Sequence, residues 1–123
     1  MGDAGTPSGR FERAVSSRNA TAALSAAAEL PTMPLHRALE LVLVLRSERD
    51  PRFARAASRW IERWLAETDG ATVDEVQELA QALVHLDDAH VCARLGAIFD
   101  ARAQRSLKRI SDQWAPTSGA PRS

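Results

Sequence analysis

Residues 34–68 read PLHRALELVLVLRSERDPRFARAASRWIERWLAET, and this stretch predicts two helices joined by a short turn. In its first half, apolar side chains cover more than half of a helix circumference, as expected of a helix packed between neighbours. In its second half, apolar residues recur every three or four positions and form one face; they are Phe53, Ala57, Trp60, Ile61, Trp64 and Leu65. Asp50 followed by Pro51 marks the second helix start, because aspartate caps a helix and proline fits its first position.

The run 41–45 is also compatible with a strand, but the chain holds no second strand-like run to pair with it. We therefore favour a helix there. Helical patterns continue on both sides: Asn19 caps a helix in the N-terminal part, and Thr72 with Glu75 forms a capping box after Gly70. The predicted helices are 10–17, 20–30, 34–49, 50–68, 72–86 and 88–114.

These six helices predict an all-α fold of three antiparallel hairpins. The hairpin that ends at residue 68 and the one that follows it match at an offset of about 38 residues, between two known helical-repeat lengths. Two arrangements stay open, a helical-repeat-like array and a compact orthogonal or superhelical bundle. The length of 123 residues predicts one domain, at 10–114, between flexible Gly/Ser/Thr/Pro-rich tails at 1–9 and 115–123.

Composition excludes several classes of protein. Formal net charge is zero, which argues against a protein that coats nucleic acid by charge alone. The single cysteine cannot form an intrachain disulfide, and no apolar run reaches the ~18 residues of a membrane span. We therefore expect a cytoplasmic protein that does not act at a membrane. Because 23 residues are alanine, the core is thin, and a homo-oligomer is a further expectation.

The segments Leu30-Pro31, Pro34-Leu35 and DPRFARAASRW at 50–60 resemble small all-helical proteins of GC-rich actinobacteria. The resemblance covers about residues 30–86. It implies a bacterial cytosolic setting and brings no activity with it.

Charge is distributed in blocks. Residues 64–93 hold seven acids and no lysine or arginine, whereas residues 37–63 and 94–123 are basic. In the predicted helix 50–68, four arginines fall within about 80° of one another; they are Arg52, Arg55, Arg59 and Arg63. Such a row suits phosphates or carboxylates, because each guanidinium binds two oxygens at once. The alternatives are a solvated face and pairing with the acidic segment 64–93.

A second basic cluster lies near the C-terminus; it consists of Arg102, Arg105, Lys108 and Arg109. The apolar stripe of helix 88–114 rotates near Arg102, so its last turns could project from the core and bind a partner through Leu107, Ile110 and Trp114. The alternative is that this end folds back and packs.

His85, Asp87, Asp88, His90 and Cys92 contain metal-ligating groups, but His90 and Cys92 point to opposite sides of one helix. We expect Asp87 or Asp88 to cap a helix and Cys92 to be a core residue, so neither a metal nor another cofactor is expected. Trp60 and Trp64 are expected in the core rather than on a base-stacking surface.

No catalytic motif occurs in the chain, so we do not expect an enzyme. The function expected from the sequence is a non-enzymatic protein–protein interaction or adaptor module. It would use the arginine row and the C-terminal basic cluster. The alternative is a nucleic-acid-binding or regulatory protein that uses the same arginines.

Overall fold

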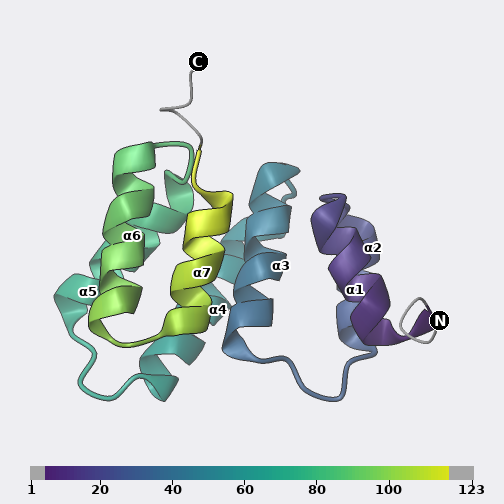
Figure 1. Ribbon diagram of the computed structural model, residues 1–123, viewed down its shortest axis with the longest axis horizontal. Helices are drawn as coiled ribbons and strands as arrows, with labels where there is room; N and C mark the ends of the chain where they lie inside the picture. The colour runs from purple at the N-terminus through teal and green to yellow at the C-terminus, as the bar shows by residue number, and fades with distance from the viewer. Residues whose placement is uncertain (1–4, 117–123) are drawn as a thin grey trace. The chain divides into compact units, whose positions relative to one another are not determined.

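The computed structural model describes residues 5–116, and within that range every regular element is an α-helix (Figure 1). The seven helices are α1 (Pro7–Ser16), α2 (Ala20–Ala28), α3 (Leu35–Ser47), α4 (Phe53–Glu67), α5 (Val73–Val84), α6 (Ala89–Ala101) and α7 (Arg105–Trp114). The all-α prediction is therefore confirmed for the described residues, and residues 41–45 belong to α3. None of these helices is long and apolar enough to cross a membrane.

The chain forms two compact units, Met1–Trp60 and Ile61–Ser123, and the division falls inside α4. In the first unit, α1 packs on α2 and both contact α3 (Figure 1). Phe11 is completely buried between small residues, among them Ala14 and Ala23. Alanines let the first two helices approach closely, which is how an alanine-rich segment builds a core around one aromatic ring.

Trp60 connects the first turns of α4 to α3. Its side chain is buried, and its indole N–H donates a hydrogen bond of 2.9 Å to the carbonyl oxygen of Leu35. A buried indole needs such a partner, because an unpaired donor in the core costs free energy. This confirms the expectation that Trp60 is a core residue.

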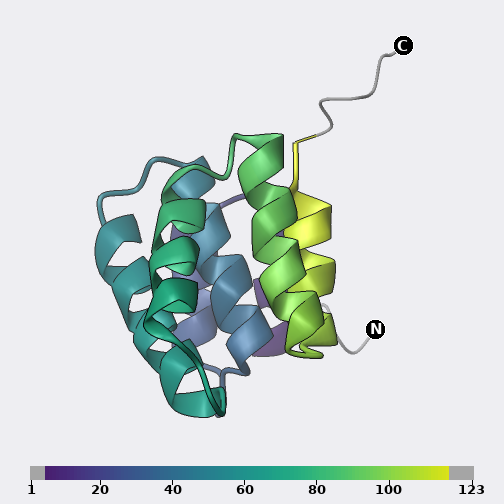
Figure 2. The same cartoon turned by 90° about the vertical axis from the view of Figure 1, so that its left-hand side faces the viewer.

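In the second unit, α6 packs against both α5 and α7. Figure 2 shows α6, in green, and α7, in yellow, running side by side. Large side chains from all four helical segments are buried here; they are Trp64, Leu79, Leu83, Leu95, Phe99, Leu107 and Ile110. Cys92 is buried as expected, with its thiol directed at the carbonyl oxygen of Leu86, 3.0 Å away.

The prediction of one continuous helix over 88–114 is wrong. The helix ends at Ala101, and the chain reverses through Arg102, Ala103 and Gln104 into α7. Ala103 adopts a left-handed conformation (φ 57°), which stops α6 and turns the chain back. Leu107 and Ile110 are consequently buried rather than projecting, so the alternative that this end folds back is confirmed.

The same stop occurs after α1 and α3, at Arg18 (φ 56°) and Arg49 (φ 52°). In each case the residue after the left-handed one donates its N–H to a carbonyl five positions earlier, as Asn19 does to Ala14 (2.8 Å) and Gln104 does to Phe99 (2.8 Å). Three helix reversals therefore share one geometry without a glycine, although glycine is the residue that adopts it most easily.

Helix boundaries agree with the predictions at the capping residues and differ elsewhere. Asn19 and Asp88 accept backbone N–H bonds at the starts of α2 and α6, and the Thr72–Glu75 capping box is present. The first helix begins at Pro7 instead of residue 10, because the Thr6 hydroxyl caps it. The fourth begins at Phe53, whereas Asp50 was expected as its cap and Pro51 as its first residue.

The predicted tails fall mostly outside the described residues. Of the segment 1–9, residues 1–4 lie outside, whereas residues 7–9 belong to α1. Of the segment 115–123, residues 117–123 lie outside. The prediction of a flexible N-terminal tail therefore has to be shortened by these three helical residues.

Candidate interaction surfaces

Arg52 is the first of the four predicted row arginines, and it is neutralised by Asp50. Its Nε and Nη2 atoms donate to the two carboxylate oxygens at 2.8 and 2.7 Å, and its backbone N–H donates to the same group at 2.9 Å. These bonds, first of all those from the guanidinium, lower the pKa of Asp50 to about 2. They also raise the pKa of Arg52. Arg52 lies in the turn before α4. Its guanidinium group is already paired with the Asp50 carboxylate.

Of the remaining three arginines, one has an acidic partner within residues 5–116 and two do not. Arg63 forms an ion pair of 2.5 Å with Glu67, one turn further along α4. Arg55 and Arg59 are exposed, and among the described residues their side chains have no hydrogen-bond or ion-pair partner. The row predicted from the sequence thus contains one pair of exposed guanidinium groups, one helical turn apart.

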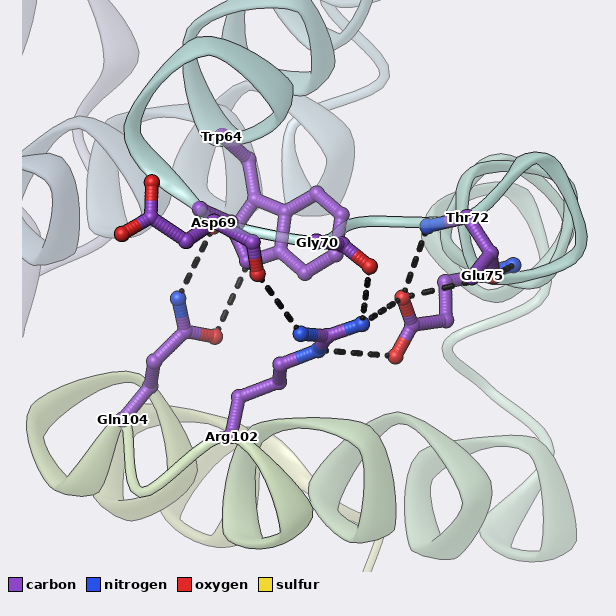
Figure 3. A network of polar contacts seen from close by, with 8 residues as sticks. Trp64, Asp69, Gly70, Thr72, Glu75, Arg102 and Gln104 are labelled. Carbon is purple, nitrogen blue, oxygen red and sulfur yellow. Dashed lines mark hydrogen bonds and ion pairs between the residues drawn. The ribbon is translucent and has the colours of Figure 1, made fainter.

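Arg102 belongs to an internal network rather than to an exposed cluster (Figure 3). Its guanidinium forms a two-point ion pair with the Glu75 carboxylate, and it also donates to the carbonyl oxygens of Asp69 and Gly70, both at 2.8 Å. The Glu75 carboxylate accepts the Thr72 N–H as well. The Arg102 bonds are the main reason that the pKa of Glu75 is lowered, and they raise the pKa of Arg102.

This network fixes the turn between α4 and α5 onto the end of α6. Gly70 adopts a positive φ of 72° in that turn, and Arg102 binds its carbonyl oxygen and that of the residue before it. Carbonyl groups at a helix end need donors, and an arginine supplies several from one position. Arg102 is therefore a structural residue, and we leave it out of any partner-binding surface.

Four other C-terminal residues were predicted to bind a partner. Two of them are exposed without an ion pair among the described residues, one forms an ion pair and one is half-buried. Lys108 pairs with Asp112 at 2.8 Å, and this bond raises the pKa of Lys108. Trp114 is half-buried. Arg105 and Arg109 are exposed on α7, and within residues 5–116 their side chains form no ion pair.

Two acids of α5 have cationic partners on α6 or at its C-terminal end, an arrangement that charge blocks alone could not show. Glu75 pairs with Arg102, and Glu78 pairs with Arg94 at 3.4 Å. Asp74 has no side-chain partner among the described residues. The acids of α5 are thus only partly neutralised.

Sequence reasoning missed a groove of about 690 Å³ between α5 and α6. Its α6 side consists of Val91, Leu95 and Ile98 together with Arg94, and its α5 side carries Asp74 and Glu78. On the same helix, Val73 and Val84 are 73% and 53% exposed, so they lie off the buried face of α5.

His85, one of the groups considered as metal ligands, lines this groove. Within the described part of the chain, no three His, Cys, Asp or Glu side chains come together in a way that could hold a metal ion.

No family model, curated protein or solved structure matches this chain. The resemblance to actinobacterial helical proteins, and the bacterial cytosolic setting that it implies, stay predictions.

Proposed function

We propose that this protein is a non-enzymatic interaction module whose Arg55–Arg59 pair on α4 binds an acidic segment of a partner protein. The observation that carries the proposal is the exposure of these two guanidinium groups, one turn apart, without partners among residues 5–116. Their neighbours Arg52 and Arg63 already have acidic partners. The chain thus neutralises the two ends of the row and leaves its middle available.

The chemistry of the pair favours carboxylates. A guanidinium group is planar and donates two parallel hydrogen bonds to a carboxylate. Side chains four positions apart on a helix lie about 6 Å apart, so they suit two acidic residues on one face of a partner helix. Both arginines are solvated, so the pair would contribute association rate and specificity more than affinity.

Nucleic-acid binding is the second candidate, and the ion pairs of the row weaken it. Two unpaired arginines would neutralise about two phosphates, and the salt dependence of binding would be correspondingly shallow. Zero net charge adds no long-range attraction for a polyanion. We therefore favour a protein partner and let the experiment separate the two.

The test compares three tagged forms of the full chain in a bacterial lysate, with and without nuclease. They are the wild type, the α4 variant Arg55→Glu/Arg59→Glu, and a matched control, Arg105→Glu/Arg109→Glu. The control reverses the charge of two arginines on α7 that are also four positions apart. We expect the wild type and the control to capture the same proteins after nuclease treatment, and the α4 variant to lose them. Unchanged capture by the α4 variant would overturn the proposal.

A nuclease-sensitive result would favour nucleic acid instead. In that case, binding of a fluorescent single-stranded DNA should weaken with salt, with a slope that becomes smaller in the α4 variant. Self-association is a separate proposal, which we base on the alanine-rich core. Light scattering on a sizing column tests it, and a monomer at all concentrations would exclude it.

A further inference from the structure

Helix α5 presents to solvent, in addition to the face that it buries, a stripe of two valines, an alanine and a glutamine, which we call the α5 stripe. Val73 and Val84 are 73% and 53% exposed, and Gln77 and Ala80 lie between them. The spacings of four, three and four residues are those of a coiled-coil seam. Because the buried face of α5 already carries Leu79 and Leu83, this second stripe is not needed for the core.

The stripe borders the groove between α5 and α6. Gln77 and Ala80 belong to both, and the groove extends along α5 as far as His85. From Asp74 to His85 the helix rises about 16 Å, or three turns. Its opposite side is formed by Leu95 and Ile98 of α6, with Arg94 at the same side. A surface of this length between two helices suits the ridge of a third helix.

Acidic groups flank the apolar part. Asp74 and Glu78 line the groove one turn apart, and the whole segment 64–93 contains no lysine or arginine. Within residues 5–116, the Asp74 side chain has no partner. The 3.4 Å pair between Glu78 and Arg94 is exposed on both sides, and such surface pairs contribute little stability, so an incoming cation can replace Arg94.

We propose that this surface, defined by the α5 stripe and the α5–α6 groove, binds a basic amphipathic helix of a partner protein. The apolar seam of that helix packs on Val73, Ala80 and Val84, and its lysines or arginines approach Asp74 and Glu78. This mode of binding depends on an apolar anchor row with a charged flank.

The acidic residues of α5 favour a basic partner helix over α5 of a second copy of the chain. Pairing of α5 with α5 from another molecule would place the two acidic flanks together, and like charges across an interface oppose binding. The proposal goes beyond the one made above, because it concerns a different helix face and a partner of the opposite charge.

Three synthetic peptides of three heptads each test the proposal by NMR titration of the isotope-labelled full chain. The first has leucine at the seam positions and lysine at the flanking positions. The second carries glutamate in place of lysine, and the third has the composition of the first in scrambled order. We expect the lysine peptide to shift amide signals of α5 and α6 and to bind at least about tenfold more tightly than the other two.

Two variants separate the apolar and the charged contributions. Val73→Ser/Val84→Ser should weaken the binding of the lysine peptide about tenfold, because it removes the two exposed valines of the stripe. Asp74→Lys/Glu78→Lys should weaken the binding of the lysine peptide by a similar factor, and this variant should bind the glutamate peptide. The matched control Glu62→Lys/Asp100→Lys changes the net charge equally at exposed acids elsewhere and should bind like the wild type.

All of these positions are exposed, so the variants should fold, and circular dichroism verifies this. The proposal is overturned if the lysine peptide does not bind, if the scrambled peptide binds equally well, or if the shifts map outside α5 and α6. Equal weakening by the control variant would likewise overturn it, because net charge rather than this surface would then govern binding.

Discussion

The indole N–H of Trp64 donates a hydrogen bond of 3.0 Å to the side-chain oxygen of Gln104. Gln104 uses its amide nitrogen for a second bond, to the hydroxyl of Thr68, also at 3.0 Å. One glutamine in the α6–α7 reversal therefore satisfies the buried tryptophan and the buried threonine near the end of α4. This is a polar connection between segments 40 positions apart in the chain.

Replacing Gln104 with alanine should destabilise the protein by about 1–3 kcal/mol, because the buried indole loses its acceptor. The measurement is urea unfolding followed by tryptophan fluorescence. Gln113→Ala is the matched control, since Gln113 is exposed on α7 and should change stability by no more than about 0.5 kcal/mol. Equal effects of the two substitutions would contradict a special role for the Trp64–Gln104 bond.

A larger residue at Gly96 should also destabilise the fold. A β-carbon at this buried position would lie 3.3 Å from the Ser111 hydroxyl oxygen and 3.7 Å from Cδ of Lys108, so α6 and α7 approach closely here. Gly96→Val should cost about 1–3 kcal/mol through overpacking, despite the gain in helix propensity. Ala97→Val, at the neighbouring exposed position, serves as the control in the same urea experiment and should lose far less. A stable Gly96→Val protein would mean that α7 can move away without cost.

The local features of the fold could be predicted from the sequence, because their causes lie within a few residues. Asn19, Asp88 and the Thr72–Glu75 pair are capping patterns, and all three cap helices in the structure. Trp60 lies on the apolar face of a periodic helix and is buried as expected. Periodicity and capping chemistry are sufficient for such predictions.

The reversal at Ala103 could not be predicted with the same rules. Alanine is the best helix former, so its left-handed conformation depends on the packing of α6 against α7 rather than on its own preference. The only local sign was the rotation of the apolar stripe near Arg102.

The binding surfaces depended on geometry that the sequence does not contain. Sequence reasoning grouped Arg102 with the exposed cations, but its partners Glu75, Asp69 and Gly70 lie about 30 positions away and are brought near by the turn after α4. The α5–α6 groove likewise arises from the distance between two packed helices.

Glycine at position 103 should stabilise the protein. The left-handed conformation disfavours a residue with a β-carbon, and glycine adopts it without that strain. We expect Ala103→Gly to gain about 0.5–1 kcal/mol, measured as an upward shift of the thermal midpoint. Ala101→Gly, two positions earlier in the helical part, should lose about as much. The left-handed stop would be refuted if both substitutions were destabilising.

The Asp50–Arg52 pair should make stability depend on pH in acid. The folded-state pKa of Asp50, about 2, lies below its ordinary value of 3.8, so the carboxylate stabilises the folded protein. For a lowered pKa this contribution is complete above about pH 4 and disappears as the pH falls towards 2. Asp50→Asn should therefore be less stable than the wild type at pH 6, and the difference should shrink at pH 2.5. Thermal unfolding of both proteins at the two pH values tests this, with Glu62→Gln as an exposed control on α4. A difference between wild type and Asp50→Asn that stays constant from pH 6 to pH 2.5 would show that the charge of Asp50 does not stabilise the fold.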